Sequence, residues 1–318
     1  MSNKAGLKCI TVDEFYGNLK EKIKLRLVAG EKGLKRRITS AEINRPGLAL
    51  SGYFKYFASQ RVQIMGKVEI TYLETISARE RKAQIKKLLN KDIPCCVVAR
   101  NYIPPKELVE ESNRLSIPLF RSPLITMTLV NKATLFMADW FAPETSITGD
   151  LLEIYGVGVL LRGESGVGKS ECALSLITRG HRLIADDVVK AKVRGGDSLV
   201  GFGSPLTRHH MEIRGLGIVN LQTLFGSGCI RENKRIDVVV SMEDWDPNED
   251  YERLGLEDKK FNILGIEMPY LILPVRPGRD IALLVEVACL NQRLKWLGYH
   301  SARDLNERLI NVMHQGKK

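Results

Sequence analysis

Ile154-Tyr155-Gly156-Val157-Gly158-Val159-Leu160-Leu161 is followed, after Arg162, by Gly163-Glu164-Ser165-Gly166-Val167-Gly168-Lys169-Ser170. These two runs decide the fold of the second half of the chain. The first run is apolar enough for a buried strand, and the second matches the pattern G-x-x-x-x-G-K-[ST]. Apolar residues at helical spacing follow, Gly180 can end that helix, and residues 183–185 predict another strand. Strand, glycine-rich loop, helix and strand in this order predict a P-loop nucleotide-binding unit of the α/β class.

The residues of this loop have distinct roles in holding a nucleotide. Glycines let backbone N–H groups approach the phosphates, and the N-terminus of the following helix favours their negative charge. Lys169 should reach the β- and γ-phosphates, and the Ser170 hydroxyl should bind Mg²⁺. ATP and Mg²⁺ are therefore the predicted cofactors. The predicted nucleotide-binding residues are Gly163, Glu164, Ser165, Gly166, Val167, Gly168, Lys169 and Ser170.

Two acids, Asp186 and Asp187, end the strand after the loop and helix, where P-loop folds present a carboxylate to a metal or a nucleophile. Adjacent residues on a strand point in different directions. One carboxylate can therefore belong to the metal environment while the other accepts a proton from an attacking hydroxyl group. The alternative from the residues alone is a pair of solvated turn residues.

Three further segments have less specific patterns. Residues 212–219 contain an acid, a base and two glycines before an apolar run, which indicates a loop and strand with close backbone approach to a ligand. Residues 274–279 put two guanidinium groups in a rigid turn, which suits either phosphate binding or a surface corner. We predict that His209 and His210 are loop residues and do not form a metal site, because adjacent residues rarely converge on one metal ion.

The first part of the chain predicts a separate domain. Thr11-Val12-Asp13-Glu14 is a capping box that begins a short helix. Short runs rich in β-branched residues, including 62–65 and 68–72, alternate with helical segments and predict an α/β domain. We place an N-terminal α/β domain at residues 1–142 and the P-loop domain at residues 143–318. Near the end of the chain, residues 281–287 predict one more core strand.

Composition excludes several classes of protein. The 318 residues are 44% hydrophobic and 27% charged, as in globular domains, and no stretch approaches the roughly 18 apolar residues of a membrane span. Charged residues interrupt the N-terminus where a signal peptide needs an apolar run. Six cysteines lack C-x-x-C spacing, so we expect reduced thiols and no zinc site. The predicted location is the cytoplasm, without a membrane partner.

The net charge of +11 comes from 48 basic and 37 acidic residues. Residues 1–150 hold 25 basic and 15 acidic residues, and residues 151–318 hold 23 and 22, so the excess lies outside the nucleotide-binding half. Part of it falls on a predicted helix at residues 78–89, which is either a solvated face or a docking surface for an acidic partner. Nucleic acid is disfavoured, because the sequence has no aromatic stacking platform and no clear helix-turn-helix.

Several segments in collinear order closely resemble the bacterial HPr kinase/phosphorylase family. They are residues 43–47, 61–66, 163–170, 180–187, 212–219, 251–255 and 274–279. The resemblance implies a kinase domain similar to the phosphoenolpyruvate carboxykinase core, assembled as a homo-oligomer, a hexamer. It implies phosphorylation of a serine on the phosphocarrier protein HPr, using ATP or pyrophosphate, as a regulator of carbohydrate metabolism in the phosphotransferase system. It also implies phosphorolysis, in which inorganic phosphate removes that group and gives pyrophosphate.

The resemblance further implies roles for individual residues. Lys169 binds phosphate, and Ser170 and Glu212 bind Mg²⁺. Asp187, supported by Asp186, is the base for phosphorylation and the acid for the opposite direction. Arg253 is implied to be a catalytic arginine, and residues 212–221 to serve both directions. Dephosphorylation is implied to depend on Pro274, Val275, Arg276, Pro277, Gly278 and Arg279.

One departure from the family's pattern stands just before the P-loop strand. The family carries His-Gly-Val there, and this chain has Thr148-Gly149-Asp150. Threonine neither titrates near neutral pH nor carries positive charge. We therefore expect a kinase-biased enzyme with weakened phosphorolysis. The alternatives are an ATP-binding regulatory protein with little phosphotransfer and a kinase that acts on a small molecule.

Overall fold

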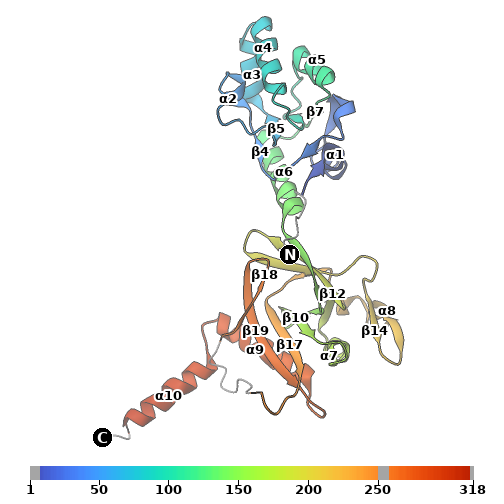
Figure 1. Ribbon diagram of the computed structural model, residues 1–318, viewed down its shortest axis with the longest axis vertical. Coiled ribbons are helices and arrows are strands. Elements are labelled where there is room, and N and C mark those ends of the chain that lie inside the picture. Colours follow the sequence, from blue (N-terminus) through green and yellow to red (C-terminus); the bar gives the residue numbers. More distant parts are fainter. Residues whose placement is uncertain (1–7, 250–257, 316–318) are drawn as a thin grey trace. The chain divides into compact units, whose positions relative to one another are not determined.

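The computed structural model describes residues 8–249 and 258–315. The chain forms two compact units, Met1–Ala142 and Pro143–Lys318 (Figure 1). Each unit contains its own sheets and its own buried clusters of apolar side chains.

The first unit is built on a five-stranded sheet. In spatial order its strands are β2 (Arg26–Ala29), β7 (Leu119–Arg121), β6 (Cys96–Val98), β5 (Val62–Met65) and β4 (Ile43–Asn44). The strands β4 to β7 run parallel, and β2 joins the edge antiparallel to β7. A separate ladder pairs β1 (Ile10–Thr11) with β3 (Arg37–Ile38), and a short 3₁₀ helix, η1 (Glu31–Gly33), precedes β3.

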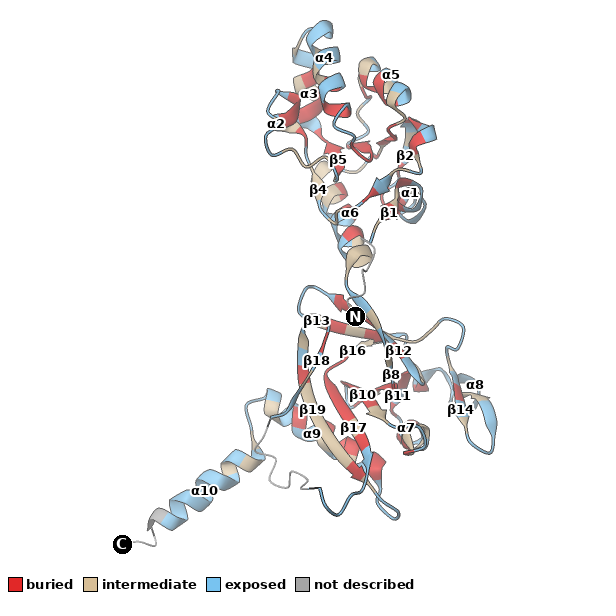
Figure 2. Ribbon diagram, viewed as in Figure 1, coloured by how far each residue is buried: buried red, intermediate tan, exposed pale blue. Residues whose placement is uncertain are grey.

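Helices pack on both faces of this sheet (Figure 2). One face is covered by α1 (Val12–Leu19) and α6 (Thr126–Phe141), and the other by α2 (Gly47–Leu50), α3 (Lys67–Thr75), α4 (Ala78–Leu89) and α5 (Lys106–Leu115). Val97 belongs to the first core, whereas its neighbours Cys96 and Val98 belong to the second, because successive strand residues face opposite sides. The predicted capping box is confirmed at the start of α1, where Thr11 and Glu14 bind each other's backbone N–H groups.

Two predicted strands were wrong. Residues 68–72 lie in α3, and residues 281–287 lie in α9 (Ile281–Trp296). In both helices a carboxylate near the N-terminus accepts a backbone N–H: Glu69 from Gly66 at 2.8 Å, and Asp280 from Leu283 at 3.0 Å. Capping of this kind satisfies the otherwise unpaired N–H groups of the first turn, and here it outweighs the strand preference of the β-branched residues.

The second unit contains a six-stranded mixed sheet. Its strands lie in the order β11 (Arg182–Ala185), β9 (Asp150–Ile154), β10 (Val157–Gly163), β17 (Val238–Asp244), β19 (Ile266–Val275) and β18 (Lys260–Ile263). The central strands β10, β17 and β19 are parallel, and β9 runs antiparallel to both of its neighbours. The carboxyl end of β10 leads into the predicted P-loop, which is therefore presented at one edge of this sheet.

A second, antiparallel sheet has the order β16 (Asn233–Arg235), β13 (Ser198–Phe202), β12 (Val188–Arg194) and β8 (Glu144–Thr148). A hairpin pairs β14 (His210–Ile213) with β15 (Gly217–Asn220). The remaining helices are α7 (Lys169–Thr178), α8 (Leu221–Phe225), η2 (Ser227–Cys229) and α10 (Ser301–Gln315). One face of the six-stranded sheet packs on α7 and α9, and the other packs on the antiparallel sheet (Figure 2). Both units are thus of the predicted α/β class.

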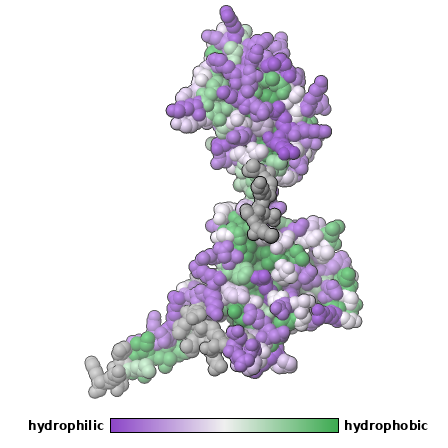
Figure 3. Space-filling view, viewed as in Figure 1, coloured by the Kyte–Doolittle hydropathy of each residue, from purple (hydrophilic) through white to green (hydrophobic). Residues whose placement is uncertain are grey.

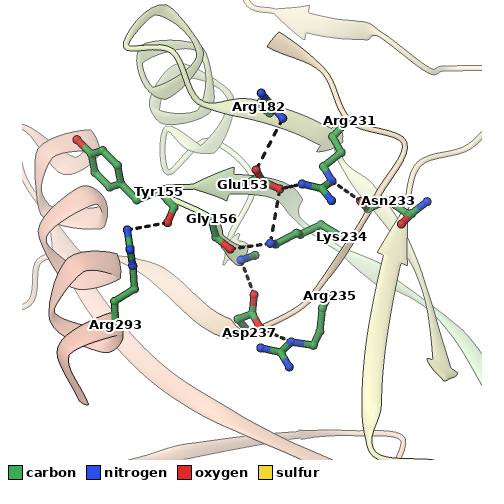
Figure 4. Close-up of polar contacts among 11 residues, drawn as sticks. Glu153, Tyr155, Gly156, Arg182, Arg231, Asn233, Lys234, Arg235, Asp237 and Arg293 are labelled. Atoms are coloured by element: carbon green, nitrogen blue, oxygen red, sulfur yellow. Dashed lines mark hydrogen bonds and ion pairs between the residues drawn. The ribbon is translucent and has the colours of Figure 1, made fainter. Parts of the chain in front are cut away.

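A polar network holds the turn between β9 and β10, at the end of these strands opposite the P-loop (Figure 4). Glu153 of β9 binds Arg231 and lies 3.5 Å from the Nζ atom of Lys234. Lys234 in turn donates to the carbonyl oxygen of Gly156 at 2.6 Å. Asp237, directly before β17, accepts the Gly158 N–H at 2.7 Å. These contacts tie β9, the turn after it and the start of β10 to residues 231–237.

The helix α10 exposes several large apolar side chains to solvent, and they gather along its surface in Figure 3. They are Leu305, Leu309, Ile310, Val312 and Met313. None of the helices in the described ranges combines the length and the apolarity required to cross a membrane.

Candidate active site

The P-loop backbone has conformations that require glycine. Gly166 and Gly168 both have φ of +96°, in the left-handed region that side chains rarely adopt. A Cβ atom on Gly163 would lie 2.5 Å from the carbonyl oxygen of Met242 on β17, and backbone cannot yield to it cheaply. The predicted glycines therefore shape the loop through conformation and close packing.

Lys169 begins α7 and turns back over the loop. Its Nζ atom donates to the carbonyl oxygens of Gly163 at 3.0 Å and Glu164 at 2.8 Å. Arg214, between β14 and β15, comes within 3.5 Å of the Ser165 hydroxyl. Two cationic groups thus lie beside the loop, together with the N-terminus of α7, and this arrangement suits the phosphates of a nucleotide.

Asp187 stands at the centre of a tight turn after β11. Its φ is +63°, and the Val188 N–H donates across it to the Asp186 carbonyl oxygen at 2.7 Å. The Asp187 carbonyl oxygen accepts the Gly149 N–H at 2.8 Å, and its own N–H donates to Asp150 Oδ1 at 2.9 Å. Both backbone polar groups of Asp187 are therefore bound, and its carboxyl group is left exposed in the cleft described below.

Asp150 was not among the residues predicted to function. It begins β9 and is 1% exposed. Burial raises the pKa of Asp150 to about 7; the Asp187 N–H opposes this rise, and the Asp186 carboxylate adds to it. Burial also raises the pKa of Asp186 above its ordinary value. Asp150 Oδ2 and Asp186 Oδ1 meet no N–H or O–H donor in the described part of the chain, and a proton held between these two carboxyl groups would give each of them a partner.

The residues assigned to Mg²⁺ present oxygen atoms to the same space. Ser170 follows Lys169 on α7, and Glu212 lies on β14 with its N–H 3.3 Å from Asp186 Oδ2. No three His, Cys, Asp or Glu side chains among residues 8–249 and 258–315 converge into a cage made by protein alone. Mg²⁺ prefers oxygen ligands, usually takes one or two from the protein, and keeps waters and phosphates for the rest. The hydroxyl and carboxylate fit that ion.

A cleft of about 660 Å³ joins these groups. Its lining comes from the P-loop, the start of α7, the acids after β11, and the β14–β15 hairpin. The predicted site residues that line it are Thr148, Gly163, Ser165, Gly166, Gly168, Lys169, Ser170, Asp186, Asp187 and Glu212, and Asp150, His210 and Arg214 join them. Glu164 contributes its carbonyl oxygen to Lys169, and Val167 packs into the core. The structure therefore brings most of the predicted residues together.

For two other regions predicted to function, the structure gives a different outcome. Arg253 lies outside the described residues. Residues 274–279 are not among the described residues that line the cleft. They close the turn between β19 and α9, where Arg276 stacks on Trp245 at 5.2 Å and Arg279 donates to the Pro274 carbonyl oxygen at 3.1 Å.

This turn is linked to the P-loop helix through the residue that follows it. Asp280 accepts a hydrogen bond at 2.7 Å from Arg179, which caps the far end of α7. The same arginine binds Glu286 of α9 at 2.9 Å. A movement of the turn between β19 and α9 would therefore act on the helix that carries Lys169 and Ser170.

Comparisons of the sequence with known proteins agree along most of the chain. The profile described as HPr Serine kinase C-terminal domain matches residues 139–309, and the one described as HPr Serine kinase N terminus matches residues 10–137. A curated relative from Brevibacillus brevis, named HPr kinase/phosphorylase, is 45% identical over 93% of this chain and 95% of its own length. One of the same name from Geobacillus thermodenitrificans is 44% identical over 94% and 96%.

Among solved structures, the Hpr(Ser) kinase/phosphatase from Coxiella burnetii is 32% identical and aligns with a TM-score of 0.46, covering 51% of this chain and 99% of that one. The family profiles together span both units, and the curated relatives match this chain over nearly their full length. The chain therefore belongs to the HPr serine kinase family.

Proposed function

We propose that this protein is a bifunctional HPr kinase/phosphorylase. It transfers a phosphoryl group from ATP, or from pyrophosphate, to a serine of HPr or an HPr-like phosphocarrier protein. In the other direction, inorganic phosphate takes the group from phosphoserine and leaves as pyrophosphate. The observation that carries the proposal is the single cleft in which the P-loop residues Lys169 and Ser170 meet the exposed carboxyl group of Asp187.

In phosphorylation, the Asp187 carboxylate accepts the proton of the serine hydroxyl as its oxygen attacks the γ-phosphorus. The bond from that phosphorus to the β–γ bridging oxygen breaks, and ADP leaves. A serine hydroxyl is a weak nucleophile, so a positioned base accelerates the step by roughly 10²- to 10⁴-fold. Lys169 balances the charge of the phosphoryl oxygens, and its ammonium group already lies against the loop carbonyls.

In phosphorolysis, an oxygen of inorganic phosphate attacks the phosphorus of phosphoserine. Protonated Asp187 donates its proton to the departing serine oxygen, and the products are serine and pyrophosphate. One carboxyl group thus serves both directions, as the base in one and the acid in the other. Arg253 is proposed as a further catalytic cation from the family resemblance, and residues 274–279 as a segment on which dephosphorylation depends.

Ser170 and Glu212 would hold Mg²⁺, which supplies positive charge that offsets the phosphates when it is bound. Thr148 lies at the end of β8, pairs with Val188 and lines the cleft, so this position faces the reacting groups without a titratable side chain. We propose that its replacement of histidine biases the enzyme toward kinase activity. A purely ATP-binding regulator is not favoured, because it has no use for a base beside the P-loop.

We further propose that residues 143–318 form the kinase/phosphorylase domain and residues 1–142 a partner-binding or regulatory domain, supported by the two compact units. Assembly into a homo-oligomer, a hexamer, is proposed from the resemblance, and the exposed apolar side chains of α10 are surfaces that assembly would bury. A cytoplasmic location is supported by six free cysteines, which are typical of a reducing compartment.

The test incubates the full chain with ATP, Mg²⁺ and the HPr protein of the same host, and maps phosphate on HPr by mass spectrometry. We expect one phosphoserine with the native protein, none with Lys169→Ala, and native rates with Lys190→Ala. Lys190 is an exposed lysine on the neighbouring strand β12 and does not line the cleft. A native protein that binds ATP but leaves HPr unmodified would overturn the proposal and favour the regulator.

A further inference from the structure

The parallel strands β4 to β7 of the first unit end at one edge of their sheet, and the chain leaves this edge toward both faces. The strand ends lie in register, with Met65 opposite Val98 and Val98 opposite Arg121. The strand β6 leads into α5 on one face, whereas its neighbour β7 leads into α6 on the other face. In open α/β sheets, binding sites form outside the carboxyl ends of such a pair of strands.

The segments that follow the four strands contact one another and form one continuous surface. After β4, Arg45 binds the carboxylate of Glu69 in the first turn of α3 at 2.9 Å. After β5, a Cβ atom on Gly66 would lie 2.4 Å from the hydroxyl oxygen of Thr126, at the start of α6. After β6, the Arg100 N–H donates at 2.8 Å to a carbonyl oxygen of the segment that follows β7. We call this surface the carboxyl edge.

The carboxyl edge is positively charged. Its segments, residues 45–48, 66–69, 99–106 and 121–128, contain five basic residues and one acid. The acid is Glu69, which is 3% exposed and is already bound to Arg45. Lys67, Arg100 and Lys106 are exposed, and none of the three is paired with a carboxylate in the described part of the chain. The acids of this edge therefore do not offset its positive charge.

The carboxyl edge also exposes large apolar side chains. Each of its four segments contributes at least one that is more than half exposed, and they are Leu48, Val68, Ile103, Ile125 and Met127. Scattered single apolar residues are ordinary on a protein surface, whereas a group of them rimmed by polar residues marks an interaction site. None of the exposed large apolar side chains within residues 8–249 and 258–315 lies on α4, the basic helix. The carboxyl edge thus combines charge with apolar surface, and α4 does not.

We propose that the carboxyl edge is a docking surface for an acidic protein segment that also carries apolar side chains. Exposed positive charge attracts acids, and Leu48, Ile103 and Met127 match an apolar counterpart, which a phosphate ion or a nucleic-acid backbone does not supply. Two copies of the same edge would place like charges against each other, so symmetric pairing with a second copy is disfavoured. The inference deepens the proposed partner-binding role of residues 1–142 and rests on that role.

The test uses the full chain without ATP or HPr, so its failure is distinct from a failure of the proposed phosphotransfer. Short random peptides are selected for binding to the native protein, and the selected peptides are synthesised and titrated by fluorescence anisotropy. The edge variant is Arg100→Glu with Ile103→Ser. The matched control, Lys86→Glu with Leu135→Ser, changes an exposed cation on α4 and an exposed apolar residue on α6, both outside the carboxyl edge. Circular dichroism checks that both variants are folded.

We expect the selected peptides to combine Asp or Glu with aliphatic residues. Their affinity should fall by at least about tenfold for the edge variant, because it reverses one charge and removes one apolar contact of the interface. The control variant should stay within about 2-fold of the native affinity, since a surface charge outside the interface has little effect. Added salt should weaken binding to the native protein, because the charges of the edge are exposed.

Peptide affinities that are equal for the edge variant and the control would overturn the proposal, as would a selection that yields no binding peptide. The same titration with single-stranded DNA, and with vesicles of phosphatidylglycerol and phosphatidylcholine, tests the other classes of partner. Binding of either one that is lost only in the edge variant, without any peptide binding, would assign the edge to that class. A change of sedimentation in the edge variant alone would make the edge an interface between copies of this chain.

Discussion

Replacing Asp150 with asparagine should flatten the dependence of folding stability on pH between pH 5 and pH 8. The side chain is buried next to Asp186, and its pKa in the folded protein is about 7, against an ordinary value of 3.8. A carboxyl group whose pKa is raised by folding contributes stability as the protonated acid. That contribution is complete below about pH 4 and is lost as the pH rises toward and through 7.

The magnitude follows from the two pKa values. Each unit of difference corresponds to about 1.4 kcal/mol, so the contribution of Asp150 to the unfolding free energy should fall by roughly that amount per pH unit between the two pKa values. Above pH 7 the folded protein also releases the proton, and the loss levels off. Over pH 5 to pH 8 the contribution of Asp150 should fall by about 2–3 kcal/mol. Asparagine does not titrate, and its amide N–H can donate to Asp186.

The assay is urea unfolding of the full chain without nucleotide at four pH values from 5 to 8, followed by circular dichroism and tryptophan fluorescence. The quantity of interest is the unfolding free energy of the native protein minus that of Asp150→Asn at each pH, because the contributions of groups far from Asp150 cancel in this difference. This difference should decline by about 2–3 kcal/mol from pH 5 to pH 8.

Asp280→Asn provides the matched control. The Leu283 N–H and Arg179 lower the pKa of Asp280, so its ionised form is stabilising above the ordinary carboxyl range, and that stability is lost only as the pH falls below it. The variant should therefore shift the curve by a constant amount from pH 5 to pH 8. Parallel curves for the native protein and Asp150→Asn would refute the assignment of a shared proton to Asp150 and Asp186.

Three further changes test the site. Thr148→His should raise the rate of phosphoserine phosphorolysis relative to the rate of phosphorylation, measured by pyrophosphate release; an unchanged ratio would remove the proposed kinase bias. Glu212→Gln should raise the Mg²⁺ concentration for half-maximal phosphorylation by at least about tenfold, since even indirect partners of a metal contribute that much, and an unchanged requirement would remove Glu212 from the metal site. Gly163→Ala should weaken ATP binding in a fluorescence titration, because the added Cβ meets the Met242 carbonyl oxygen. Gly228→Ala adds its Cβ in open space and should leave ATP binding unchanged. Equal ATP affinities for the two variants would contradict the packing argument.

The parts of the site that could be predicted from sequence are those in which neighbouring residues carry the chemistry. The P-loop is one continuous segment with a fixed spacing, and Asp186 and Asp187 follow it by one helix and one strand. By contrast, the hydrogen bond from the Asp187 N–H to Asp150 joins residues 37 positions apart, across strands that run antiparallel. A single acid at the start of an apolar strand gives no sign of its partner.

The errors in the fold have a similar origin. Residues 68–72 and 281–287 are rich in apolar and β-branched residues, which favours strands. The structure makes them helices because Glu69 and Asp280 cap the N-termini of α3 and α9, and because α9 packs one face against the six-stranded sheet. The antiparallel sheet formed by β8, β12, β13 and β16 was not predicted. Only β12 and β13 are joined by a short turn, whereas β8 and β16 pair with them from segments that lie far away along the chain.

The central claim is that Asp187 serves as the base for phosphorylation and as the acid for phosphorolysis. The direct test compares Asp187→Asn with the native protein in two separate reactions, transfer from ATP to HPr and attack of inorganic phosphate on phosphoserine-HPr, with ATP binding measured alongside. Asparagine keeps the size of the side chain but can neither accept nor release the proton, so we predict that both rates fall by at least about 10²-fold while ATP still binds. A native rate in either direction would contradict the claim.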